Sequence, residues 1–146
     1  MKQDQNKKAA EKELKEIVSH ADATLVGFVE LGASFGLALD YSLDSLDEVE
    51  KLLVTFKSRP EFGKLKADAW LYVGECICRS LKGKWAVSDD LQYYRHHHML
   101  PIVKGFSRFN DEYCPMLEID RFLESGKKSF LKNTIHMMQT GTYRYG

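Results

Sequence analysis

The chain has 146 residues, of which 44% are hydrophobic, so it is long and apolar enough for one domain with a continuous core. Its 21 lysines and arginines balance 21 aspartates and glutamates, and this neutral balance excludes a general attraction to nucleic acid or to an anionic membrane. No apolar run approaches the roughly 20 residues of a membrane-spanning helix, so we expect no membrane association.

The N-terminal segment, residues 1–35, has the periodicity of an amphipathic helix. It begins rich in lysine and glutamate and then turns apolar, and apolar positions recur every seven residues at Leu14, Ala21, Phe28 and Phe35. A break near residues 20–23 would give two helices. The repeat lasts too few turns to decide between a packed helix, which we favour, and a homodimer through a coiled coil of this helix.

A second helix is indicated by Ser45 and Glu48, which have the three-residue spacing of a capping box. In that motif, each side chain satisfies a backbone N–H that the start of a helix leaves unpaired. Lysine and arginine then precede Pro60, and cations suit the last turn of a helix while proline restricts the residue before it. We therefore expect this helix to end just before Pro60.

A third helix, about residues 62–82, is predicted to be central, because apolar or small side chains cover most of its circumference. Gly83 is expected to supply the left-handed residue that commonly ends a helix. Cys76 and Cys78 would point about 200° apart on this helix, which is too divergent for one metal ion or a local disulfide. We interpret both cysteines as small buried side chains.

Beyond the third helix, the apolar pattern changes to the alternating period of strands. Residues 84–88 predict a short strand, residues 92–99 a second strand, and residues 100–103 a third strand or its continuation. Pro101 belongs at an edge, because proline cannot donate to a sheet ladder. We expect these strands to form a small antiparallel sheet.

The last third of the chain returns to helical spacing. Pro115 suits the first position of one helix, which should end at Ser125 and Gly126, and a final helix should stop near Gly141. The sequence therefore predicts the α+β class, as a mainly helical single domain with a small antiparallel sheet in its second half.

The organisation that we expect is a polar N-terminal helical extension over residues 1–20 and one α+β domain over residues 21–140. No repeat, low-complexity block or linker interrupts the sequence. Three cysteines are an odd count and no signal-peptide pattern precedes them, so we expect a soluble, cytoplasmic protein in a reducing compartment.

Three short motifs resemble those of a group of small uncharacterised bacterial α+β proteins, over about residues 21–138. The motifs are Leu39-Asp40-Tyr41-Ser42 before a helix, Gly74-Glu75 inside an apolar helix, and Gly83-Lys84-Trp85 at the start of a strand. Some similar proteins occur near toxin and immunity systems, so the resemblance implies a compact domain and an immunity-type role. Lys84 departs from the pattern, which has a second glycine there, and the resemblance implies no catalytic residue.

The run His96-His97-His98 is the cluster that most suggests a metal site. His96 and His98 would face the same side of a strand, but zinc needs a third or fourth ligand and no spacing brings one near. We expect no metal and no cofactor, and we interpret the run as part of a polar edge strand or loop. No serine or cysteine lies in a nucleophile-elbow motif, so the sequence favours a non-enzymatic protein without catalytic residues.

Glu75 lies in the middle of a largely apolar helix, where a carboxylate must be exposed, paired or functional. Arg79 has the i,i+4 spacing of an ion-pair partner, which favours a structural pair. The alternative is a small-ligand-binding protein or an enzyme with a pocket between the third helix and the sheet, formed by Glu75, Trp85 and Tyr41.

A second candidate site is a stretch that mixes aromatic, basic and histidine side chains, as protein-binding hot spots do. Its residues are Tyr93, Tyr94, Arg95, His96 and His98, continued by Phe106, Arg108 and Phe109. A neutral net charge favours a protein partner over nucleic acid. We therefore expect a non-enzymatic protein-interaction module, such as an immunity-type protein that blocks one partner through this stretch.

Overall fold

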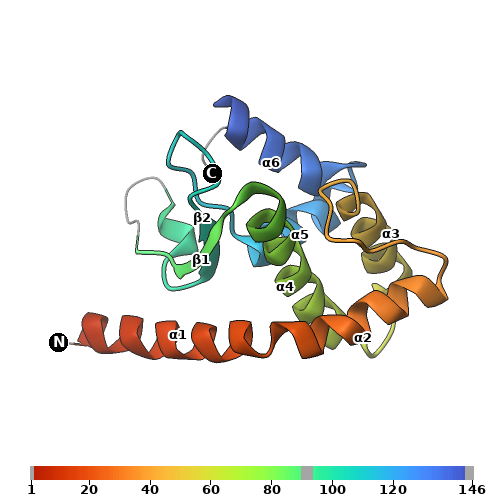
Figure 1. The fold of residues 1–146 in the computed structure, drawn as a ribbon, viewed down its shortest axis with the longest axis horizontal. Coiled ribbons are helices and arrows are strands. Elements are labelled where there is room, and N and C mark those ends of the chain that lie inside the picture. The colour runs from red at the N-terminus through yellow and green to blue at the C-terminus, as the bar shows by residue number, and fades with distance from the viewer. Residues whose placement is uncertain (1, 90–93, 144–146) are drawn as a thin grey trace.

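The computed structural model describes residues 2–89 and 94–143. In these residues the elements follow in the order α1 (Lys2–Ser19), α2 (Ala21–Ser34), α3 (Leu46–Phe56), α4 (Phe62–Leu81), β1 (Lys84–Val87), the 3-10 helix η1 (Arg95–His97), β2 (Pro101–Lys104), α5 (Pro115–Ser125) and α6 (Phe130–Thr140) (Figure 1). The α+β class is confirmed, since the described part is mostly helical with a two-stranded antiparallel sheet in its second half. None of the described helices is long and apolar enough to span a membrane.

The N-terminal segment forms two helices, at the break that its sequence allowed. α1 ends at Ser19, and His20 leaves helical geometry with φ −105° and ψ 7° before α2 begins at Ala21. α2 buries Ala21, Leu25 and Phe28, which share one face at helical spacing. The two helices run one after the other along one edge of the molecule (Figure 1).

The start of α3 differs from the predicted capping box. Ser45 already has helical φ and ψ, and its side chain makes no cap bond; its hydroxyl instead lies 2.7 Å from the hydroxyl of Tyr72. Ser42 takes over the cap, because its Oγ accepts the Ser45 N–H at 3.1 Å. Asp40 in turn accepts hydrogen bonds from the N–H and Oγ of Ser42. The capping residue is therefore Ser42, three positions before Ser45, because the Ser45 hydroxyl contacts the buried Tyr72.

α4 is central, as its sequence predicted, and packs against α2, α3, α5 and both strands. It ends at Leu81, but the left-handed residue that follows is Lys82, with φ 59°, and not Gly83. Glycine is needed at position 83 for space, because a Cβ there would lie 2.6 Å from Cγ1 of Val103. The prediction that Gly83 is the left-handed residue was wrong. Position 83 requires glycine because it packs closely on β2, and not because of its backbone conformation.

The hairpin of β1 and β2 joins α4 to the C-terminal third. The strands pair antiparallel, with Val87 opposite Pro101 at the end of the ladder, where the missing N–H of proline is tolerated. Val103 of β2 also exchanges two backbone hydrogen bonds with Tyr113, of 2.8 and 2.9 Å. This bridge places the chain for α5, which begins at Pro115 as predicted.

The prediction of a strand over residues 92–99 is wrong for residues 94–99, which the structure describes. Residues 95–97 form the 3-10 helix η1 instead. The His97 N–H donates to the Tyr94 carbonyl at 2.8 Å. Tyr94 and His97 are buried whereas His96 and His98 are exposed, so burial recurs after three residues and not after two. A 3-10 helix has three residues per turn and therefore buries both side chains.

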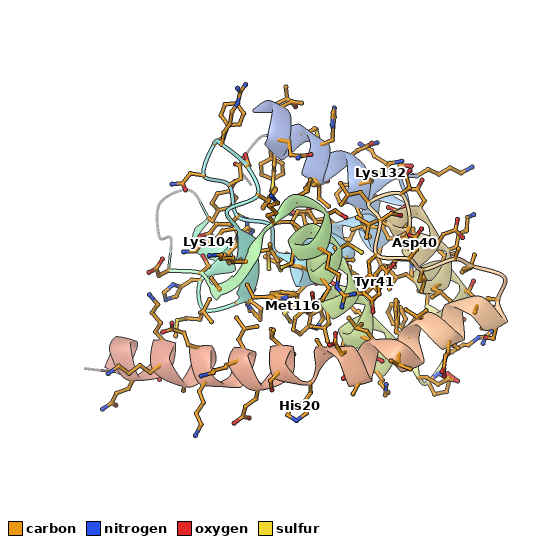
Figure 2. All side chains as sticks on the ribbon, in the orientation of Figure 1. His20, Asp40, Tyr41, Lys104, Met116 and Lys132 are labelled. Carbon is orange, nitrogen blue, oxygen red and sulfur yellow. The ribbon has the colours of Figure 1, made fainter. Side chains whose placement is uncertain are left out.

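The N-terminus of α6 is capped by a residue from a distant helix. The Glu50 carboxylate of α3 accepts the N–H groups of Ser129 and Leu131, both at 2.9 Å. Lys132, labelled on α6 in Figure 2, lies 3.3 Å from the Asp44 carboxylate just before α3. These contacts hold the N-terminus of α6 against α3.

Candidate functional site

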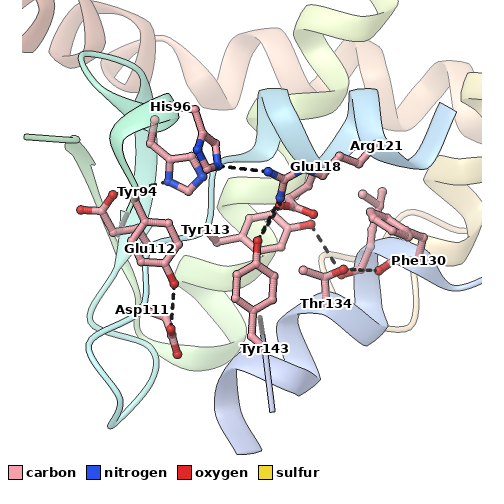
Figure 3. Close-up of polar contacts among 12 residues, drawn as sticks. Tyr94, His96, Asp111, Glu112, Tyr113, Glu118, Arg121, Phe130, Thr134 and Tyr143 are labelled. Atoms are coloured by element: carbon pink, nitrogen blue, oxygen red, sulfur yellow. Dashed lines mark hydrogen bonds and ion pairs between the residues drawn. The ribbon is translucent and has the colours of Figure 1, made fainter. Parts of the chain in front are cut away.

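The predicted binding stretch surrounds a set of polar side chains, here called the η1 network. Its members come from η1, the segment after β2, α5 and the residues after α6 (Figure 3). They are Tyr94, His96, His97, Asp111, Glu112, Glu118, Arg121 and Tyr143.

Tyr94 is part of the core, which corrects its prediction as a surface residue. Only 2% of it is exposed, and its hydroxyl donates to Asp111 Oδ1 at 2.8 Å. Its ring stacks on His97 with a centroid distance of 4.7 Å. Ser107 donates to the other oxygen of Asp111, so this buried carboxylate is satisfied on both sides. Tyr94 holds η1 against the segment after β2 and cannot touch a partner.

Arg121 connects the exposed and buried parts of the network. Its NH1 donates to Glu118 Oε1 at 2.6 Å and to the Tyr143 hydroxyl at 2.9 Å, and its NH2 lies 3.1 Å from His96 Nε2. A guanidinium can only donate, so His96 Nε2 is the acceptor in this arrangement. Glu118 is 1% exposed, and burial raises the pKa of its carboxyl even though Arg121 lowers it. The carboxylate is therefore held by a cation that is itself anchored by three partners.

His97 occupies the interior of the network. It is fully buried, and its Nδ1 lies 3.5 Å from Glu112 Oε1, an oxygen that also accepts the Ser88 Oγ–H at 2.6 Å. Neither ring nitrogen of His97 makes a hydrogen bond of full geometry. The ring is therefore placed by stacking on Tyr94 and by the charge of Glu112.

The network does not form a nucleophilic site among the described residues. Ser88 donates its proton to a carboxylate and does not face an imidazole base, as a triad would require. Cys114 is buried, and burial raises the pKa of its thiol to about 11, so the reactive thiolate is not available near neutral pH. In residues 2–89 and 94–143, no three histidine, cysteine or acidic side chains are placed to hold a metal ion.

Two exposed residues of the stretch, Arg108 and Phe109, and Met137 of α6 form an apolar and basic surface, here called the Phe109 patch. Phe109 is 42% exposed and Met137 is 38% exposed. The Arg108 guanidinium lies 4.9 Å from the centroid of the Phe109 ring, and that ring covers Gly141 at the end of α6. Met137 lies one turn before Gly141 on the same face of α6.

The other residues of the predicted stretch lie elsewhere. Phe106 is 8% exposed and belongs to the core, so its prediction as a binding residue is corrected. His96 and His98 are exposed, as expected. Tyr93 and the side chain of Arg95 lie outside the described residues.

The second predicted site, around Glu75, is a structural cluster on α4. Glu75 Oε2 lies 3.7 Å from Arg79 Nε, so the predicted i,i+4 pair is confirmed. Arg79 also pairs with Asp22 of α2 at 3.1 Å, and its guanidinium lies 3.8 Å from the centroid of the Tyr41 ring. Burial raises the pKa of Glu75 and the charge of Arg79 lowers it. The cluster joins α2, the loop after it and α4.

Trp85 fills the place where the alternative prediction put a ligand pocket. Its indole lies against Gly74 of α4, and it packs edge to face on Trp70 with a centroid distance of 5.8 Å. The indole also lowers the pKa of Glu75, although its buried Nε1–H makes no hydrogen bond of full geometry. Because the indole fills the space beside Gly74, this arrangement weakens the alternative of a small-ligand pocket between α4 and the sheet.

Several residues of the η1 network were not predicted as site residues. Glu118 and Arg121 have the i,i+3 spacing of a helix pair, which was the available signal, but a buried glutamate on an amphipathic helix resembles an exposed one in sequence. Asp111 and Glu112 lie in a segment without periodicity. Tyr143, after the end of α6, joins the network through its contacts with Arg121 and Tyr94.

Comparisons with protein-family models, with curated proteins and with solved structures find no match for this chain. The site is therefore interpreted from its own geometry.

Proposed function

We propose that the protein is a non-enzymatic binding module whose rigid fold presents the Phe109 patch to one protein partner. The observation that supports this proposal is the pairing of Phe109, which is 42% exposed, with the Arg108 guanidinium 4.9 Å from its ring centroid, on a backbone that Ser107 holds in place. Aromatic side chains, methionine and arginine are also the residue types enriched in protein interfaces.

The η1 network supports the proposal by holding the surface in place. Ser107 Oγ accepts the Phe109 N–H at 3.1 Å, and its single proton is shared between the Asp111 carboxylate and the Met138 carbonyl, so the backbone beneath the patch is tied to both the network and α6. A preorganised patch loses little conformational entropy on binding. Steric blocking of the partner by this patch is the mechanism of an immunity-type protein, the role implied by the resemblance to small bacterial α+β proteins.

The test is affinity capture by the tagged full-length chain from its native host, with Phe109→Ala, Arg108→Ala and the wild type side by side. Phe35→Ala is the matched control, since Phe35 is 43% exposed and also lies beside an arginine, Arg59. We expect Phe109→Ala to reduce the captured partner roughly tenfold or more and Phe35→Ala to leave it unchanged. Recovery of no partner, or equal capture by the Phe109→Ala variant, would contradict the proposal.

The homodimer through the N-terminal helix stays a prediction. Size-exclusion chromatography with light scattering, on the full chain and on a chain that begins at Ala21, tests it. A monomer in both forms would remove it.

A further inference from the structure

α1 crosses the body of the protein and buries little of its own surface there. At one end it continues into α2, and at the other Lys7 pairs with Asp89, next to the end of β1, at 2.7 Å. Among the described side chains of α1, Leu14 is buried and the others are half-buried or exposed. The middle of α1 therefore covers the body of the protein incompletely.

Three hollows lie between α1, α4, α5 and the hairpin, and all three are lined by Trp70. Their volumes are about 440, 200 and 240 Å³. Ile17 lines two of them, and so does Met116, which lies between α1 and the body of the protein in Figure 2. We call the surface that these hollows share, formed by Ile17, Trp70 and Met116 beside the buried Leu14, the Trp70 furrow.

The charges that line the furrow are mostly negative. They are the carboxylates of Glu13, Glu16, Asp68 and Asp120, against the ammonium of Lys66 and the imidazole of His20.

The carboxylates differ in whether the protein already neutralises them. Asp120 pairs with Lys66, and Asp68 pairs with Lys64 at 2.7 Å. Glu13 and Glu16 are exposed on α1 and form no ion pair with any described residue. An apolar floor with two unneutralised carboxylates above it is complementary to a segment that is both apolar and basic.

We propose that the Trp70 furrow binds a basic, amphipathic segment of another protein. One or two large apolar side chains of the segment would displace water from Trp70 and Met116, residue types that are enriched in binding surfaces and, for methionine, adapt their shape. Flanking lysines or arginines would pair with Glu13 and Glu16. α1, which forms one side of the furrow, and α6, which carries Met137 of the Phe109 patch, lie at opposite edges of the molecule (Figure 1), so this inference does not depend on the proposed function.

The first arm of the test varies the probe and uses the full-length chain. A synthetic amphipathic peptide of leucine and lysine is titrated into the 15N-labelled protein, beside a leucine and glutamate peptide and a serine and lysine peptide of the same length. We expect the leucine and lysine peptide alone to shift the indole N–H signal of Trp70 and the amides of α1. Equal binding of the leucine and glutamate peptide, or shifts confined to another face, would overturn the proposal.

The second arm varies the protein with charge-matched controls. Glu13→Lys with Glu16→Lys should weaken binding of the leucine and lysine peptide roughly tenfold. Glu30→Lys with Glu124→Lys changes the net charge equally at exposed glutamates outside the furrow and should weaken it far less. Equal weakening by both pairs would mean general attraction between charges and would overturn the proposal.

The third arm tests the apolar floor and the competing occupant. Met116→Gln should weaken peptide binding, whereas Met137→Gln, at an exposed methionine on α6, should not. Circular dichroism of each variant shows whether it is folded, and the charge variants of exposed α1 residues keep the test valid if Met116→Gln unfolds. Light scattering that finds a dimer in which a second copy covers Trp70 would also overturn the proposal.

Discussion

Replacement of Gly74 by alanine should destabilise the protein, because Trp85 occupies the space that the new methyl group needs. A Cβ at position 74 would lie 3.0 Å from Trp85 Cε2 and closer still to Cη2 and Cζ2, and a rigid indole cannot bend away as a flexible chain could. Overpacking of this kind costs about 1–3 kcal/mol. The approach to Cη2 and Cζ2 places this substitution in the upper part of that range, about 2–3 kcal/mol, and alanine returns about 1 kcal/mol of helix propensity, so we expect a net loss of about 1–2 kcal/mol.

Gly27→Ala provides the matched control. Gly27 lies inside α2, and a Cβ there would meet no atom within 4 Å. The same substitution should therefore stabilise the protein by about 0.5–1 kcal/mol. Urea unfolding followed by far-UV circular dichroism measures both variants, and the Gly74→Ala loss corresponds to a fall of about 2–8 °C in Tm.

A double-mutant cycle with Trp85→Leu assigns the effect to its cause. In the Trp85→Leu background, Gly74→Ala should no longer destabilise the protein, which gives a coupling free energy of about 2 kcal/mol. If Gly74→Ala costs the same in both backgrounds, or behaves like Gly27→Ala, the reasoning from the close approach of the indole is refuted.

Three further changes test the buried polar groups. Glu50→Ala removes the cap of α6 and should cost about 2 kcal/mol in urea unfolding, whereas Glu48→Ala, which removes only the exposed pair with Lys51, should stay within about 0.5 kcal/mol; equal effects would refute the cap. Tyr72→Phe leaves the Tyr41 N–H without its acceptor at 2.9 Å and should cost about 1–3 kcal/mol, and an unchanged midpoint would contradict this. Burial raises the folded-state pKa of Glu118 above the ordinary 4.5, so its contribution is fully present below pH 4.5 and is lost as pH rises through the folded pKa. As pH rises above 4.5, the free energy of unfolding of the wild type should therefore fall relative to that of Glu118→Gln. Parallel pH profiles of the two proteins in urea unfolding would refute the raised pKa.

Helices and their order were predictable because each signal was local. The apolar faces of α2, α3 and α4, the proline at the start of α5 and the glycine after its end all act within a few residues. The misassigned details involve contacts between distant segments. Ser45 stands where a capping residue is expected, but its hydroxyl forms a hydrogen bond with the hydroxyl of Tyr72 on α4.

The candidate site was only partly predictable for the same reason. Aromatic and histidine residues near position 95 stand out in the sequence, but their division into buried and exposed members depends on η1, whose three-residue repeat is too short to be distinguished from alternation. Exposure of Phe109 depends on Gly141, far along the chain. The ion pair of Glu75 with Arg79 was predictable because both residues lie on one helix.

The cap that Glu50 places on α6 makes the backbone amides of Ser129 and Leu131 reporters of a single tertiary contact. When α3 and α6 separate, both amides lose their acceptor at once, although the rest of each helix can persist. Their hydrogen-exchange rates should therefore change together, and both should report the free energy of that local opening. An isolated peptide of residues 127–143 would lack the cap entirely, so α6 should gain its full helical content only after α3 has docked.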